Sequence, residues 1–390
     1  MNHYIICHYG EIALKGRNRK SFEQALARNI RLSISKVVRA SVRRISGRII
    51  IGLKKDLSAE QKDTINDKLK NTFGIVHFSP AISCQQDIKE IGNKVVEELK
   101  KKNFSTFRIN TQRAEKTFPL NSQQINEQIG AFVLKKLKAV KVNLKNPDIT
   151  VFIEIVEKYA FIYTEKIPGS GGLPVGVSGK AVSLLSGGID SPVASYLAMK
   201  RGLEIILVHF HAFPYTNKAS LEKVKKIAAV LNRFQFRLKL YLIPFAKCQK
   251  DIMLKTPAGL RIILYRRMML RIAEKIAERE KAKAIVTGEN LGQVASQTIE
   301  NMASISQAVN TFILRPLVGE DKFEIIKKAE KIGTYQLSIL PYDDCCSLFL
   351  PKRPKTKSKI EEIEKAEKNL DLEKLITEAL EKASLETFPR

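Results

Sequence analysis

The chain has 390 residues, 44% of them hydrophobic, and a formal net charge of +27. This length predicts two or three domains with buried cores, and neither a membrane-spanning run nor a secretory signal is visible. Five cysteines without C-x-x-C spacing argue against a zinc knuckle or a disulfide framework and fit a reducing compartment. We therefore expect a cytoplasmic protein of several domains that does not enter a membrane.

The positive charge is unevenly distributed along the chain. Residues 1–60 hold 13 Lys and Arg against 4 Asp and Glu. Such an excess favours a polyanionic partner, most simply a nucleic acid. The alternative is a charged surface that serves solubility, as in Lys-rich thermophile proteins. On charge alone we favour the polyanion.

The first 166 residues alternate between short strands and helices in an α+β pattern. Apolar residues three and four apart predict the helices, and alternating apolar residues predict the strands. The helix near 121 has a cap candidate in Asn121 or Ser122. We expect two α+β units, covering 1–59 and 60–166. The expected strands are 3–9, two within 37–53, then 73–83, 104–114 and a pair within 149–167; the expected helices are one ending near 35, then 60–70, 87–102 and 121–138.

The stretch 168–180, PGSGGLPVGVSGK, is rich in Gly and Pro and predicts a linker. Its end imitates the Walker phosphate loop, G-x-x-x-x-G-K-[ST]. Pro174 and Ala181 occupy the positions of the first glycine and the final Ser or Thr, so the motif is not met.

From about 174 to 390, strands and helices alternate regularly. This predicts an α/β domain with a doubly wound parallel sheet, whose ligands bind beyond the C-terminal ends of the strands. Residues 355–390 are charged and predict a solvated C-terminal helix. The expected strands are 181–185, 204–210, 236–243 and 283–287; the expected helices are 191–201, 219–232, 260–280 and one after GENLGQVASQ.

The stretch VSLLSGGIDS, 182–191, predicts a phosphate-binding turn between a strand and a helix. Its two glycines let the backbone turn tightly and expose N–H groups, and its serines add donors. The carboxylate of Asp190 would repel phosphate, so it implies Mg²⁺ between the two. A bare Gly-Gly turn would be weak evidence, but the full S-G-G-x-D-S string in this context predicts a site for the phosphates of ATP. The residues of this turn are Ser186, Gly187, Gly188, Asp190 and Ser191.

These motifs resemble a known family. The turn is similar to the PP-loop of ATP pyrophosphatases, which adenylate a carbonyl oxygen. Together with YGEIALKGRNRKSFE, VTGENLGQVASQT, RPLVGEDK and PYDDCC, it resembles the ThiI family of tRNA 4-thiouridine synthetases (tRNA sulfurtransferases) over nearly the whole chain. The resemblance implies an N-terminal ferredoxin-like domain, a THUMP RNA-binding domain and a PP-loop domain. THUMP domains have few fixed residues, so that match is the least specific.

The resemblance also assigns roles to individual residues. Lys322, in GEDK, matches a catalytic lysine whose charge suits the developing phosphate charge. Without the family match, Lys322 would be one lysine among many. His209-x-His211 could suggest a metal, but no third ligand is apparent, so we expect no resident metal there. The positions that match ATP-binding residues are Leu184, Leu185, His209, Phe210, Arg266, Gly288 and Gln297.

Cys345, in DDCC, matches the sulfur-relay cysteine of the family, because a thiolate can carry a persulfide. The preceding acids should raise its pKa, so activation must come from elsewhere, for example from Lys322. Some family members carry a rhodanese domain with a second cysteine, whereas here only a charged tail follows. We therefore expect the form without rhodanese, with sulfur coming from a cysteine desulfurase or another donor, from inorganic sulfide or through Cys346. We expect structural roles for Cys7, Cys84 and Cys248.

The resemblance thus predicts ATP-dependent thiolation of uridine 8 in tRNA. We also expect a homodimer, since one tRNA could span two chains. Sulfur delivery to the thiazole pathway of thiamine, through a sulfur carrier protein, stays open as an additional role. One alternative is a PP-loop synthetase that adenylates a small molecule, against which the basic N-terminal half argues. The other is an RNA-binding protein without catalysis, against which the intact loop and Lys322 argue.

Overall fold

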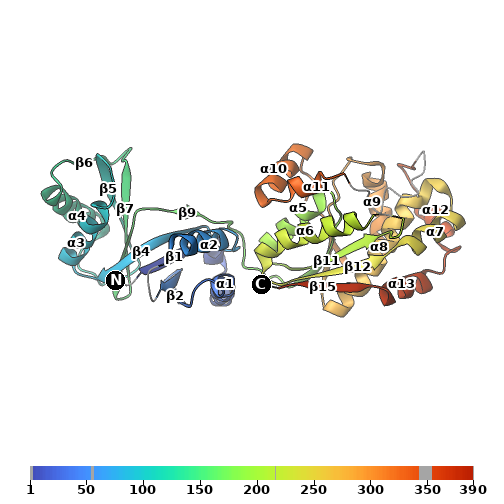
Figure 1. Cartoon of the computed structure of the whole chain (residues 1–390), viewed down its shortest axis with the longest axis horizontal. Helices are drawn as coiled ribbons and strands as arrows, with labels where there is room; N and C mark the ends of the chain where they lie inside the picture. The colour runs from blue at the N-terminus through green and yellow to red at the C-terminus, as the bar shows by residue number, and fades with distance from the viewer. Residues whose placement is uncertain (1–2, 54–56, 216, 342–353, 390) are drawn as a thin grey trace. The chain divides into compact units, whose positions relative to one another are not determined.

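The computed structural model describes residues 3–53, 57–215, 217–341 and 354–389 (Figure 1). The chain divides into two compact units, Met1–Pro174 and Val175–Arg390, within the stretch that the sequence predicted as a linker. Across the described ranges, we find no helix with both the length and the hydrophobicity needed to cross a membrane.

The first unit is built on one nine-stranded sheet in the order β2-β3-β1-β4-β8-β7-β5-β6, with β9 paired to β4. Its N-terminal part has the element order β1-α1-β2-β3-α2-β4, and its strands pair antiparallel. This confirms the predicted ferredoxin-like fold. The elements of this part are β1 (His3–His8), α1 (Arg19–Ile34), β2 (Ala40–Ile45), β3 (Arg48–Leu53), α2 (Ala59–Lys70) and β4 (His77–Gln85).

The rest of the first unit packs two helices on the other end of the same sheet. Helix α4 begins after Asn121, whose side chain accepts a hydrogen bond from Gln124 N (2.9 Å) while the Gln124 side chain accepts from Asn121 N (2.8 Å). This capping box confirms Asn121 as the predicted cap. The elements here are α3 (Ile88–Leu99), β5 (Thr106–Arg113), α4 (Ser122–Lys136), β6 (Lys141–Val142), β7 (Ile149–Val156), β8 (Tyr159–Tyr163) and β9 (Ile167–Pro168).

A buried polar cluster joins the two parts of this unit. Glu154 of β7, only 1% exposed, lies 2.8 Å from His8 Nε2, accepts from Tyr163 Oη (2.6 Å) and pairs with Arg48. The rings of His8 and His77 stack with centroids 4.3 Å apart. Burial alone would raise the pKa of Glu154, but the hydrogen bond with His8 and the charges of His8 and Arg48 lower it to about 2. A charged carboxylate therefore links strands from both parts.

The second unit confirms the predicted doubly wound sheet, with the order β14-β13-β10-β11-β12-β15. The chain builds outward from β10 to β12 and then crosses to the other side of β10, which makes β10/β13 the point where strand order reverses. Because crossovers between parallel strands are right-handed as a rule, such a change in the direction of strand order places connecting helices on both faces of the sheet. The central elements are β10 (Lys180–Leu184), α5 (Asp190–Lys200), β11 (Glu204–His211), α6 (Lys218–Gln235), β12 (Leu238–Pro244), α7 (Ala246–Lys255), α8 (Arg261–Glu280), β13 (Ala284–Val286), α9 (Ile299–Ser306) and β14 (Phe312–Leu314).

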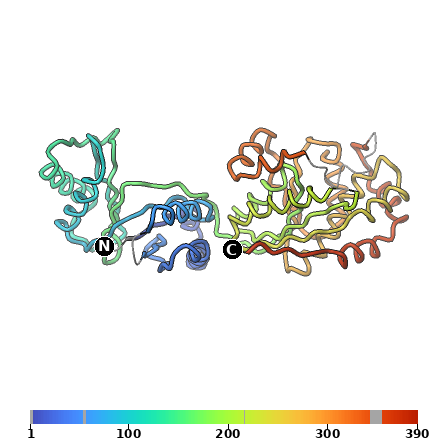
Figure 2. Tube along the Cα trace, in the orientation of Figure 1, coloured from blue at the N-terminus to red at the C-terminus, as the bar shows by residue number. Residues whose placement is uncertain are grey.

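The C-terminal tail differs from its prediction as a solvated helix, which was wrong. It forms α12 (Ile360–Glu367), α13 (Leu372–Glu381) and β15 (Ser384–Phe388), and β15 pairs antiparallel with β12 (Figure 2). Apolar residues of both helices join the core that also packs α7 and α8. Its two helices are amphipathic: charged residues on one face outnumber the apolar residues that are buried on the other, so the composition alone indicated an exposed helix.

Candidate active site

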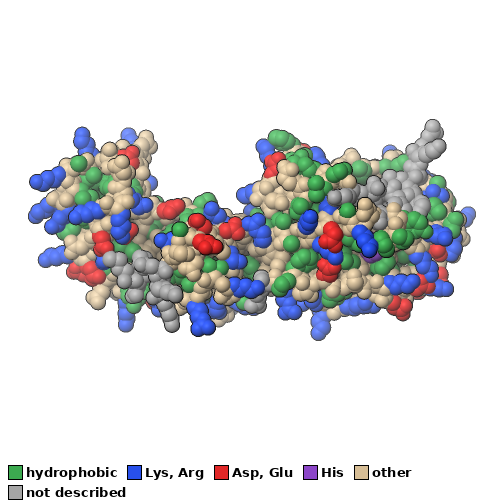
Figure 3. Space-filling view, in the orientation of Figure 1, with side chains coloured by type: hydrophobic (Ala, Val, Ile, Leu, Met, Phe, Trp, Pro, Cys, Tyr) green, Lys and Arg blue, Asp and Glu red, His purple; other side chains and the backbone are tan. Residues whose placement is uncertain are grey.

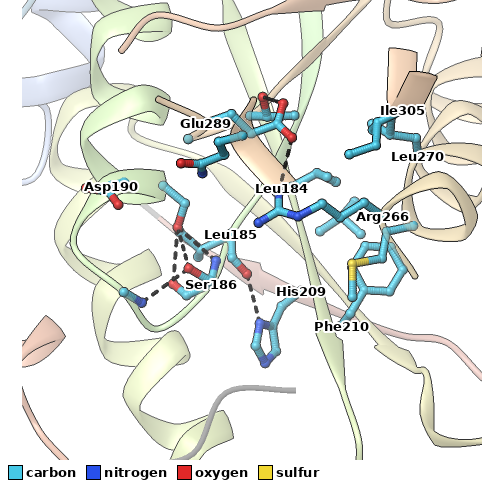
Figure 4. Close-up of a pocket in the computed structure, with 17 residues that line it drawn as sticks. Leu184, Leu185, Ser186, Asp190, His209, Phe210, Arg266, Leu270, Glu289 and Ile305 are labelled. Atoms are coloured by element: carbon cyan, nitrogen blue, oxygen red, sulfur yellow. Dashed lines mark hydrogen bonds and ion pairs between the residues drawn. The ribbon is translucent and has the colours of Figure 1, made fainter. Parts of the chain in front are cut away.

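A pocket lies at the C-terminal ends of β10, β11 and β13, next to the reversal of strand order (Figure 4). Such a reversal leaves a crevice, because the connecting helices leave the sheet on opposite faces. The glycine turn enters it from β10, and the opposite side is apolar, with Phe210, Leu270 and Ile305 (Figure 4).

The glycine turn is held by hydrogen bonds among its own residues. Ser191 Oγ accepts from Ser186 N (2.8 Å) and lies 3.1 Å from the Ser186 hydroxyl, and Gly188 N donates to Ser186 Oγ (3.2 Å). The turn leads directly into the N-terminal end of α5, where helix dipole and free N–H groups favour an anion. These hydrogen bonds and the start of α5 give the loop the shape of a phosphate-binding turn.

Gly288, just after β13, lies against the start of α5. A Cβ atom at this position would be 2.8 Å from Ser191 N and 2.9 Å from Ser191 Cα. Since backbone atoms cannot move aside cheaply, only glycine permits this approach of the two loops.

Lys322 reaches the glycine turn from 132 residues further along the chain. Its Nζ lies 2.6 Å from Asp190 Oδ1, and both side chains are partly exposed. Lys322 is the first residue of α10 (Lys322–Ile332), whose start is fixed by a capping box between Asp321 and Glu324. Helix α11 (Tyr335–Ser338) follows, and Ser338 Oγ donates to Gly188 O (3.3 Å). The first residue of α10, Lys322, and the last residue of α11, Ser338, therefore both contact the glycine turn or the residue that follows it.

Glu289 forms a charged cluster in the wall of the pocket. Its carboxylate is 5% exposed and pairs with Arg266 Nη1 (3.1 Å) and Arg315 Nε (2.8 Å). Thr287 Oγ1 also donates to it (3.0 Å). The Glu289 carboxylate is therefore bound by Arg266 of α8, by Thr287 after β13 and by Arg315 after β14.

Two further polar side chains complete the pocket. His209 Nδ1 is 2.8 Å from Leu185 O, and burial lowers the pKa of His209 to about 4, so the ring is neutral near pH 7. Gln297 Oε1 is buried and has no hydrogen-bond partner among the described residues. A buried amide oxygen without a partner indicates a place for a ligand donor, such as an amino group.

The cysteines separate into two groups. Cys7, Cys84 and Cys248 are buried, and burial raises the pKa of each thiol, to about 12 for Cys84 and Cys248, which makes them poor nucleophiles. Cys345 and Cys346 lie outside the described residues. The chain leading towards them is held at its described end by the buried Lys223, whose Nζ donates to Leu340 O (2.9 Å).

The structure brings together most of the residues that the sequence singled out. Gly187 lies within the turn but does not line the pocket, and Lys322 reaches the turn from outside it. No group of three His, Cys, Asp or Glu side chains suited to a metal occurs among the described residues. The predicted residues that line the pocket are Leu184, Leu185, Ser186, Gly188, Asp190, Ser191, His209, Phe210, Arg266, Gly288 and Gln297; those that the prediction missed are Val208, Met269, Leu270, Thr287, Glu289 and Ile305.

The fold and the glycine turn define an ATP pyrophosphatase-type PP-loop domain preceded by a ferredoxin-like and a THUMP domain. Three family models match: the ThiI ferredoxin-like domain over 4–79, the THUMP domain over 85–165, and the Thiamine biosynthesis protein (ThiI) model over 176–372. The chain belongs to the ThiI family of enzymes. The domain boundaries expected from the sequence stay predictions.

Individual relatives agree along the whole chain. "Probable tRNA sulfurtransferase" of Moorella thermoacetica is 44% identical over 98% of this chain and 97% of its own length, and that of Coxiella burnetii is 45% identical over 98% of each. A solved structure described as a 4-thiouridine synthetase–RNA complex with bound ATP is 41% identical, covers 100% of both chains and has a TM-score of 0.89.

Proposed function

We propose that this protein is a tRNA sulfurtransferase that converts uridine 8 to 4-thiouridine at the expense of ATP. The observation that carries the proposal is the contact of Lys322 with Asp190, at the mouth of a preformed phosphate turn. The names of the relatives and the ATP and RNA bound in the solved relative support it. A tRNA substrate also implies action in the cytoplasm.

In the first half-reaction, O4 of the uridine attacks the α-phosphate of ATP and pyrophosphate leaves. The glycine turn would hold the departing phosphates, and Lys322 would stabilise their growing negative charge. Asp190 is one carboxylate beside a phosphate site, which suits Mg²⁺ because this ion uses few protein ligands plus phosphate oxygens. When bound, Mg²⁺ would neutralise phosphate charge.

The adenosine part of ATP fits the other end of the pocket. Phe210, Leu270 and Ile305 offer an apolar surface to the base. Gln297 Oε1, which lacks a hydrogen-bond partner in the described ranges, could accept from an amino group. We further propose that Leu184, Leu185, His209, Arg266 and Gly288 bind ATP.

Gly288→Ala offers a direct test of this nucleotide site. The added methyl group should displace the loop at a cost of about 1–3 kcal/mol, and we expect ATP affinity to fall roughly tenfold. Gly319→Ala is the matched control, because a Cβ there meets no atom of the described residues within 4 Å. Calorimetric titration with ATP and Mg²⁺ measures both; equal affinities for the two variants would contradict the proposed site.

The tRNA would be bound by the basic first unit. Figure 3 shows Lys and Arg side chains gathered over the region of α3, α4 and β6. Such charges bind the backbone and the shape of a folded RNA without reading its sequence. The target base would have to leave its stack to reach the pocket. Exposed lysines of this region include Lys100, Lys101, Lys102, Lys135, Lys136, Lys138, Lys141 and Lys145.

In the second half-reaction, the outer sulfur of a Cys345 persulfide attacks C4 of the adenylated uridine and AMP leaves, so that the base is joined to Cys345 through an S–S bond. A second thiol then attacks Sγ of Cys345, which breaks this bond, releases 4-thiouridine and leaves a disulfide that an external thiol reduces. We propose a cysteine desulfurase as the sulfur donor and a homodimer as the working assembly. Cys346 could resolve the persulfide on Cys345 as a disulfide.

Cys345→Ser separates the two half-reactions. We expect the variant to release pyrophosphate from ATP in the presence of tRNA while forming no 4-thiouridine, detected by mass spectrometry of tRNA nucleosides. Cys248→Ser is the control, since this buried thiol should not carry sulfur. The absence of 4-thiouridine from the wild type with an active donor would contradict the proposed function, and ATP–pyrophosphate exchange that ignores tRNA would favour a small-molecule synthetase.

A further inference from the structure

The pocket wall contains a carboxylate that has no assigned role, Glu289. It is 5% exposed and lies between Arg266, at 3.1 Å, and Arg315, at 2.8 Å. Arg315 is also fixed by a hydrogen bond from Nη2 to Ser306 Oγ (2.7 Å). Glu289 is therefore fixed by Arg315, which is itself hydrogen-bonded to Ser306, and it pairs with a second arginine, Arg266.

The held arginine, Arg266, faces the pocket (Figure 4). Within the described part of the chain, the one hydrogen-bond partner of its guanidinium group is Glu289, which accepts from Nη1. A guanidinium group has five N–H donors in a planar fork, so Nε and Nη2 keep donors that a bound ligand can use. At 28% exposure, a free arginine would sample many rotamers, and the carboxylate restricts this freedom.

We propose that Glu289 is a positioning residue for nucleotide binding, which orients the Arg266 guanidinium so that its remaining N–H donors meet acceptor atoms of ATP. This inference rests on the proposed function. Thr287 and Arg315 hold the Glu289 carboxylate in place through hydrogen bonds. The carboxylate in turn orients the guanidinium group of Arg266, which would contact the nucleotide. The two arginines and one carboxylate also leave one net positive charge in the wall, which favours an anionic ligand.

The same chain contains a matched cluster that lies outside the pocket. Glu367 of α12, 8% exposed, pairs with Arg267 (2.8 Å) and Arg271 (2.6 Å) of α8, the helix that also carries Arg266. None of these three residues lines the pocket. A buried carboxylate that pairs with two arginines thus occurs twice beside α8, once facing the nucleotide site and once joining the tail.

The test measures the dissociation constant for ATP with Mg²⁺ by calorimetry, together with the thermal midpoint of each full-length variant. Glu289→Gln and Arg266→Met should each weaken ATP binding about tenfold, equivalent to about 1.4 kcal/mol. The double variant should bind ATP no more weakly than the single variant with the lower affinity, because both substitutions remove the same interaction. Glu367→Gln should lower the thermal midpoint and leave ATP binding unchanged.

Glu289→Asp covers the case in which Glu289→Gln does not fold. It keeps the negative charge among the arginines but shortens the side chain by one methylene, so it should weaken ATP binding about threefold or more. Arg266→Lys, which keeps the charge and loses the fork, should behave similarly.

Several outcomes would overturn the inference: wild-type affinity in Glu289→Asp, additive losses in the double variant, or equal losses in Glu289→Gln and Glu367→Gln. A wild type that fails to bind ATP would instead count against the proposed function. The two failures are therefore distinguishable.

Discussion

Lys322→Met should lower the rate of tRNA thiolation by about 10²–10³-fold, the usual effect of removing one preorganised group that stabilises transition-state charge. Lys322 lies 2.6 Å from Asp190, beside the turn that would hold the departing phosphates. The loss should appear in pyrophosphate release as well, because the lysine would act in the adenylation step. Single-turnover assays with labelled ATP and tRNA measure both rates.

The stability of the protein should hardly change in this variant. Lys322 is 44% exposed, and partly exposed ion pairs contribute about 0–1 kcal/mol. Lys327→Met, an exposed lysine of the same helix, is the control and should retain wild-type rates. Asp190→Ala should lose activity as Lys322→Met does. Near-wild-type thiolation by Asp190→Ala would refute the assignment of the loop.

Glu154→Gln should lower the free energy of unfolding of the first unit by about 3–5 kcal/mol, the typical cost of breaking a buried ion pair. Glu154 is 1% exposed, and its loss as an anion leaves Arg48, itself 10% exposed, without its buried counter-charge. Urea unfolding of the full chain, with hydrogen exchange of β4 and β7, measures the effect. Glu165 is an exposed residue of the same unit, and Glu165→Gln should change neither the free energy of unfolding nor the hydrogen exchange. Equal stability of the Glu154→Gln and Glu165→Gln variants would contradict a stabilising role for the Glu154 cluster.

The pH dependence of stability follows from the same carboxylate. The pKa of Glu154 falls from an ordinary 4.5 to about 2, so the stability that it contributes is complete above pH 4.5 and is lost as the pH falls through about 2. Burial and the charge of His8 lower the pKa of His77 to about 4, which removes stability as the pH falls from 6.5 to 4. In Glu154→Gln, only the lower of these two losses should disappear.

The phosphate turn could be predicted because its determinants are local. Two glycines, the serines around them and a helix start lie within six residues, and the structure forms the turn with hydrogen bonds among these same residues. A catalytic role for Lys322 could be expected only through the family resemblance, since nothing near Lys322 in sequence distinguishes it from other lysines. Glu289 was missed because its partners come from α8 and from the end of β14.

The fold of the C-terminal tail could not be predicted either, because it also depends on contacts with residues distant in the sequence. Its composition predicted a solvated helix, yet Ile363, Leu375 and Ile376 are buried, and β15 adds an antiparallel strand beside β12. Helical periodicity was present in the sequence, but the surface that buries it lies on α7 and α8, about a hundred residues earlier. Helix α7 was missed as well, because ten residues with scattered charges carry a weak periodic signal.

Four features could be predicted from the amino-acid sequence alone: the phosphate turn, the α/β alternation, the basic N-terminal region and the family to which the chain belongs. These features depend on short-range geometry, on composition or on strings of adjacent residues. Three features became visible only in the folded chain: the contact of Lys322 with Asp190, the ion pair of Glu289 with Arg266, and the packing of the charged tail into the core. Each of these contacts joins residues far apart in the chain, and only the packing of the sheet and its helices brings them within bonding distance.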